Sequence, residues 1–156
     1  KTLYKGTIYA FRSRLMGVIS EPSSLMFIEY PELIERHELR SHKRFKCSIV
    51  SLVGFENNEH EGVIENISMG GCLCVMPVFT SDGNFAERLM NQRLSVRCHF
   101  PGANEESRFV GKIKNTKKKS NEIAVGMEFI YPDETDETRA IINDFIQLIE
   151  YSSVNV

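Results

Sequence analysis

The sequence predicts an all-β protein, an antiparallel barrel or sandwich followed by a C-terminal helix. Two observations carry this prediction. Short segments alternate apolar and polar residues with a period of two, and turns that contain Gly, Asn or Pro separate them. The length of 156 residues suits one domain, or one domain with part of another.

Six segments between residues 46 and 129 are the expected barrel strands. In Gln92–Phe100 every second residue from Leu94 onward is apolar, and the residues between are polar or charged. Lys46–Val53 is mostly apolar on both faces, which indicates a more buried strand. The other four are His60–Ile67, Gly71–Met76, Arg108–Asn115 and Glu122–Phe129. The expected turns are Gly54–Glu59, Pro101–Glu106 and Thr116–Asn121.

Two segments interrupt the strand pattern. Asn84–Asn91 is expected to form a short helix between strands. Thr135–Tyr151 is expected to form a longer helix whose apolar stripe consists of Ile141, Ile142, Phe145, Leu148 and Ile149. We expect this stripe to cover one side of the barrel.

Residues 1–34 form a separate part of the prediction. Thr7–Phe11, Gly17–Ile19 and Leu25–Tyr30 have the composition of strands, whereas Pro31–Glu38 is polar and charged. We therefore interpret residues 1–34 as the C-terminal part of an upstream β-rich domain, and residues 35–44 as an interdomain junction.

Charge, hydropathy and the absence of certain motifs argue against several classes of function. The net charge of −2 gives no global electrostatic case for binding long nucleic acid, and no apolar run is long enough to insert into a membrane. No nucleophile–base motif or phosphate-binding loop occurs, so we expect no enzyme activity. The spacing of the cysteines and histidines argues against a metal site. We expect reduced core cysteines in a cytoplasmic protein; these are Cys47, Cys72, Cys74 and Cys98.

Positive charge is concentrated in one short stretch, ELRSHKRFKCS, which contains Arg40 and Arg44. Arginine grips a phosphate with its planar fork and stacks on an aromatic base. The stretch NISMGG, residues 66–71, adds Asn66 and Ser68 as hydrogen-bonding groups. Its two glycines, Gly70 and Gly71, permit positive φ and close approach of a ligand. Together these residues indicate a ligand that carries both phosphate and purine.

The two stretches resemble the signature of the PilZ domain family, RxxxR followed after a strand by (D/N)xSxxG. The resemblance covers residues 38–151 and includes the strand-like AVGMEF of residues 124–129. It implies a six-stranded antiparallel barrel that binds cyclic di-GMP. Arg40 and Arg44 would contact the phosphates and stack on guanine, Asn66 and Ser68 would read the guanine edge, and the glycines would permit the turn.

The resemblance has further implications. Leu39, which precedes the arginine pair, offers no charge to a second stacked ligand and favours a single ligand per site. Residues 1–34 resemble the end of the companion domain of flagellar-brake-type PilZ proteins. Binding would order residues 35–44, change the interdomain arrangement and alter a surface seen by a protein partner. The expected role is a receptor that controls motility, biofilm or virulence.

Alternatives stay open at this point. A PilZ scaffold could serve only as a protein-interaction module that binds no ligand. A small barrel could also bind nucleic acid through the run Lys112–Lys119, although a solvated hairpin tip is the favoured explanation of those lysines. Oligomeric state is undecided, and a homodimer formed through residues 1–34 is one option.

Overall fold

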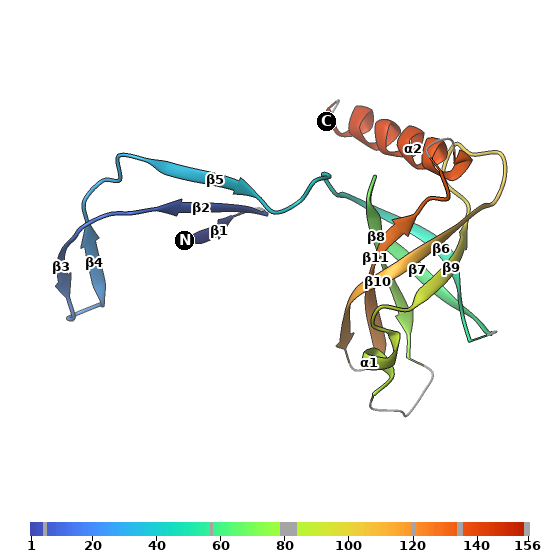
Figure 1. Ribbon diagram of the computed structural model, residues 1–156, viewed down its shortest axis with the longest axis horizontal. Coiled ribbons are helices and arrows are strands. Elements are labelled where there is room, and N and C mark those ends of the chain that lie inside the picture. Colours follow the sequence, from blue (N-terminus) through green and yellow to red (C-terminus); the bar gives the residue numbers. More distant parts are fainter. Residues whose placement is uncertain (5, 57, 79–83, 120, 134–135, 155–156) are drawn as a thin grey trace. The chain divides into compact units, whose positions relative to one another are not determined.

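The structure is a computed structural model that describes residues 1–4, 6–56, 58–78, 84–119, 121–133 and 136–154 (Figure 1). The chain divides into two compact units, residues 1–41 and residues 42–156. We describe the two units separately.

The C-terminal unit is a closed antiparallel barrel of six strands, in the order β10-β11-β8-β7-β6-β9. Pairing of β6 with β9 closes the barrel, so the ladder has no open edge. The all-β prediction and the six-stranded barrel are both confirmed. The strands are β6 (Phe45–Phe55), β7 (Asn58–Ser68), β8 (Gly71–Pro77), β9 (Arg93–Cys98), β10 (Ser107–Lys119) and β11 (Glu122–Ile130).

Alternation along the strands builds the core of the barrel. Every second residue points inward, and the fully buried side chains include Ile64, Val96, Ile113, Ile123 and Val125. The expectation that Lys46–Val53 is a more buried strand is wrong for its outer face, where Val50 is 73% exposed. A barrel wall has one solvent face, so even a largely apolar strand leaves alternate residues outside.

Two helices lie at opposite ends of the barrel, α1 (Phe85–Leu89) and α2 (Glu137–Val154) (Figure 1). The ring of Phe145 lies 5.4 Å from that of Phe100. Leu148, expected in the apolar stripe, is 49% exposed. The face turned to the barrel consists of Ile142, Phe145, Ile146 and Ile149, at the spacing i, i+3, i+4, i+7, and Ile141 also packs against the core as expected. Thr135, the expected first residue of this helix, lies outside the described residues.

The N-terminal unit contains a three-stranded sheet and a separate hairpin. The sheet has the order β1-β2-β5, from β1 (Thr2–Tyr4), β2 (Thr7–Phe11) and β5 (Ile34–Glu38). The hairpin pairs β3 (Leu15–Ile19) with β4 (Leu25–Ile28). Among the described residues of this unit no side chain is buried. Residues 35–38, expected to belong to the junction of residues 35–44, instead form most of the exposed edge strand β5, whose polar sequence gives no alternation signal.

Within the described part of the chain, neither helix is long and apolar enough to cross a membrane.

Phe145 tests the packing of α2 on the barrel. Phe145→Ala removes a ring that is 5% exposed, and we expect it to lower the free energy of unfolding by about 3–5 kcal/mol. Leu148→Ala, on the exposed face of the same helix, is the matched control and should change it by no more than about 0.5 kcal/mol. Urea denaturation followed by circular dichroism measures both. Equal losses would contradict the packing described.

Candidate functional site

The end of β7 and the start of β8 hold the polar half of the predicted signature. Asn66 and Ser68 lie at the end of β7, and Gly71 begins β8. The ladder is irregular beside Asn66 on both sides, between Lys46 and Ile49 against β6 and between Ile64 and Asn66 against β8. Such bulges re-aim side chains and are common next to functional sites.

Hydrogen bonds fix the turn between these strands to the end of β11. The amide of Phe129 donates to the carbonyl of Gly70 (3.0 Å), and the hydroxyl of Tyr131 donates to the carbonyl of Met69 (3.2 Å). Burial raises the pKa of Tyr131 to about 12, so this hydroxyl keeps its proton at neutral pH. The turn is therefore a rigid platform before any ligand arrives.

The two glycines act differently from the expectation. Neither Gly70 nor Gly71 has a positive φ. A Cβ on Gly71 would lie 2.0 Å from the carbonyl oxygen of Met127, so glycine lets β8 approach the backbone of β11. A Cβ on Gly70 would lie 2.8 Å from Cδ2 of His42. The glycines thus make room for protein neighbours. The expectation that they adopt positive φ is wrong.

Asn66 presents an unusual polar atom. Its Oδ1 is buried and accepts no hydrogen bond from the described residues. A buried acceptor without a donor costs about 1–3 kcal/mol, so proteins rarely leave one without a purpose. Ser68 is satisfied, because its hydroxyl donates to the carbonyl of Gly71 (3.1 Å).

The basic half of the signature is divided between the units. Arg44 directly precedes Phe45, which pairs with Ile67 and so places Arg44 beside the end of β7. Arg40 belongs to the N-terminal unit, as does Leu39, which is 53% exposed. Both arginines are exposed, and within the described residues neither forms an ion pair.

The sequence predicted no role for two residues between the arginines, His42 and Lys43. Besides the contact of His42 with Gly70, Lys43 lies 3.1 Å from Glu150 of α2 and 4.8 Å from the ring centre of Phe45. Their spacing in the sequence gives no signal, because their contacts are with a turn and a helix that are distant in sequence.

A model of the family described as PilZ domain matches residues 38–148 of the chain. This chain belongs to the PilZ family. A curated relative, the cyclic di-GMP binding protein VCA0042 of Vibrio cholerae, is 23% identical over 125 residues, which cover 80% of this chain and 48% of the relative. The chain thus spans about half the length of that relative.

Solved structures share the fold. The inhibitor of motility MotI/DgrA of Bacillus subtilis has a TM-score of 0.62 at 18% identity, and the match covers 89% of this chain and 66% of that one. YcgR of Escherichia coli in complex with c-di-GMP has a TM-score of 0.63 at 11% identity, covering 98% and 65%. The MrkH–c-di-GMP complex of K. pneumonia has a TM-score of 0.62 at 15% identity, covering 98% and 70%.

Lys117, Lys118 and Lys119 are exposed and lie at the end of the β10–β11 hairpin, as expected, although β10 extends further than predicted. β10 continues to Lys119 because residues 117–119 pair with residues 122–124 of β11. Lys114 forms an ion pair with Glu128 (3.0 Å). Phe109, the nearby aromatic that a stacking platform would need, is 7% exposed and packs on Phe129 inside the barrel. The strand therefore lacks an exposed ring at this position.

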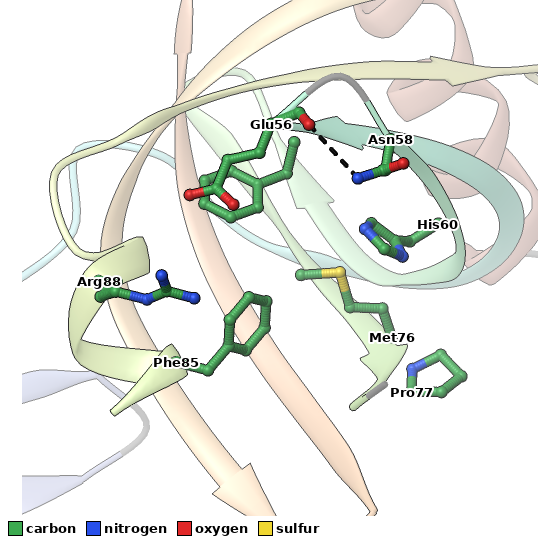
Figure 2. A pocket seen from close by; sticks show the side chains of 8 residues that line it. Glu56, Asn58, His60, Met76, Pro77, Phe85 and Arg88 are labelled. Carbon is green, nitrogen blue, oxygen red and sulfur yellow. Dashed lines mark hydrogen bonds between the residues drawn. The ribbon is translucent and has the colours of Figure 1, made fainter. Parts of the chain in front are cut away.

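A hollow of about 240 Å³ lies at the other end of the PilZ barrel. Figure 2 shows Phe85 and Met76 beside it, and the ring of Phe85 meets that of Phe55 edge to face at 6.0 Å. Asn58 Nδ2 donates to the carbonyl of Glu56 at its rim (3.3 Å). None of the described lining residues belongs to the signature, so the hollow is separate from the candidate site.

The cysteines lie in or against the core of the barrel as free thiols. Burial raises the pKa of Cys98 to about 12 and that of Cys47 to about 11, which disfavours the reactive thiolate. Among the described residues, no group of three or more His, Cys, Asp or Glu side chains could hold a metal ion.

Asn66 and Ser68 offer a direct test of this geometry without ligand. Asn66→Ala removes an unsatisfied buried acceptor, so the free energy of unfolding should stay within about 0.5 kcal/mol of the wild type or rise. Ser68→Ala removes a hydrogen bond and should lower it by about 1 kcal/mol. Chemical denaturation of both variants measures this. A larger loss for Asn66→Ala than for Ser68→Ala would show that Asn66 is satisfied within the fold.

Proposed function

We propose that this PilZ domain binds cyclic di-GMP at the β7–β8 turn and acts as a regulatory receptor without catalytic activity. The observation that carries the proposal is the buried Oδ1 of Asn66, which has no hydrogen-bond partner among the described residues and lies near Arg44 at the end of β7. The family membership and the name of the Vibrio cholerae relative support the same ligand.

The chemistry of the ligand fits these groups. Guanine carries N–H donors on its edge, and Asn66 Oδ1 is an acceptor that lacks a donor. The two phosphodiesters carry negative charge, and the guanidinium groups of Arg40 and Arg44 are donors without acidic partners among the described residues. Ser68 completes the set at the turn, and Gly70 and Gly71 keep it free of side chains. A local basic segment suffices, so a net charge of −2 is no obstacle.

The unit boundary falls between Ser41 and His42, inside the arginine pair. A ligand held by both arginines would therefore link the two units. We propose that binding orders residues 35–44 and changes the arrangement of the units, at an entropic cost offset by phosphate and stacking contacts.

The physiological role is part of the proposal. Residues 1–34 would belong to a companion β domain, because the unit's large apolar side chains are exposed. The receptor would act in the cytoplasm on a protein partner in motility, biofilm formation or virulence. The Bacillus subtilis neighbour is named an inhibitor of motility, which favours a role in motility.

The arginines provide the decisive binding test. Arg40→Ala and Arg44→Ala should each weaken cyclic di-GMP binding by roughly tenfold or more, since each loses charge-assisted hydrogen bonds and stacking. Isothermal titration calorimetry measures this, and Leu39 predicts one ligand per chain. Arg93→Ala, an exposed arginine at the start of β9, is the control and should bind normally. A folded wild-type chain that binds no cyclic di-GMP would refute the proposal.

The proposed rearrangement has its own test. Small-angle scattering at saturating cyclic di-GMP should give a different distance distribution from that of the free chain. Arg44→Ala at the same ligand concentration should keep the distribution of the free chain. Identical curves for the saturated and free wild type would leave a receptor that binds without rearranging its units.

A further inference from the structure

We propose that His42 is a positioning residue, which packs on Gly70 and holds the second arginine of the signature, Arg44, ready for the ligand. The inference rests on the proposed binding of cyclic di-GMP and adds a residue that the signature RxxxR leaves unspecified. His42 and Gly70 both belong to the C-terminal unit.

The first step is the contact itself. Cδ2 of the His42 imidazole lies 2.8 Å from the position that a Cβ on Gly70 would occupy, and Nε2 lies 3.5 Å from it. A real Cβ almost never lies that close to another atom, so a methyl group on residue 70 would force the exposed His42 ring to move. Gly70 has no positive φ, so the backbone itself does not demand glycine here.

The second step is the rigidity of the surface beneath the ring. The carbonyls of Met69 and Gly70 are held by Tyr131 and Phe129, and Ser68 bonds back to Gly71. A side chain that packs on this turn is therefore tied to the end of β11.

The third step is the placement of Arg44 between fixed points. Phe45, which follows it, is 9% exposed and pairs with Ile67. Lys43, which precedes it, contacts Glu150 and the ring of Phe45. With His42 anchored as well, residues 42–45 are docked on the barrel. The ordering on binding proposed above for residues 35–44 would therefore concern residues 39–41, since residues 35–38 lie in β5. An arginine side chain that is already held in place loses less conformational entropy on binding than a mobile one.

A double-mutant cycle tests the inference. His42→Ala should weaken cyclic di-GMP binding by roughly threefold to tenfold, the size expected when an ordered side chain must be immobilised anew. Gly70→Ala should weaken it by a similar factor, because the new methyl group displaces the ring. In the His42→Ala background Gly70→Ala should have little further effect, since nothing is left to displace.

Other outcomes would overturn it. Equal effects of Gly70→Ala in both backgrounds would mean that the methyl group meets the ligand directly. His42→Phe keeps a flat ring on Gly70 and should restore most of the affinity; failure to restore it would mean that the imidazole nitrogens act on the ligand instead. Melting temperatures of all variants should match the wild type.

A measurement without ligand separates this inference from the proposed function. In the free chain, nuclear Overhauser effects should connect the His42 ring proton on Cδ2 with the α-protons of Gly70. Their absence would contradict the prepositioning even if the wild type binds. A wild type that shows them but binds no cyclic di-GMP would refute the proposed function, and with it the role of His42 for this ligand.

Discussion

The close approach of β8 to β11 at Gly71 is the constraint on which the candidate site depends. No side chain fits there, because a Cβ would lie 2.0 Å from the carbonyl oxygen of Met127. The approach lets the turn before Gly71 bond to the end of β11 through Phe129 and Tyr131. These hydrogen bonds hold the turn, and with it Asn66 and Ser68, in a fixed position on the barrel. Preorganised polar groups of this kind bind with little loss of conformational entropy.

The proposed site draws on residues from two parts of the chain. The barrel supplies the turn, the unpartnered acceptor of Asn66 and, through Phe45, the position of Arg44. Arg40 lies across the unit boundary, at the end of the N-terminal unit. A ligand that needs both arginines would be sensitive to the arrangement of the units and could change it. This division of one short motif between two units is the physical basis of the proposed switch.

Sequence reasoning reached the barrel because burial imposes a period of two, which Leu94, Val96 and Cys98 show clearly. It proposed the site from residue chemistry, from the order of the two motifs and from their resemblance to the PilZ signature. It missed β5, whose charged residues are exposed on both faces, and it ended β10 too early, because exposed lysines at the paired end of a strand give no alternation signal. It misjudged the glycines and overlooked His42, because their roles depend on contacts between segments distant in sequence.

The most direct test of the central claim is a titration of the isotopically labelled chain with cyclic di-GMP, followed by two-dimensional ¹H–¹⁵N NMR. We predict that the largest shifts fall on residues 42–44 and 66–71, including the side-chain amide of Asn66. Shifts should be small around Phe55 and Phe85, at the other end of the barrel, and along the lysines of β10. Shifts centred on either of those regions, or none at all, would contradict the assignment of the ligand to the β7–β8 turn.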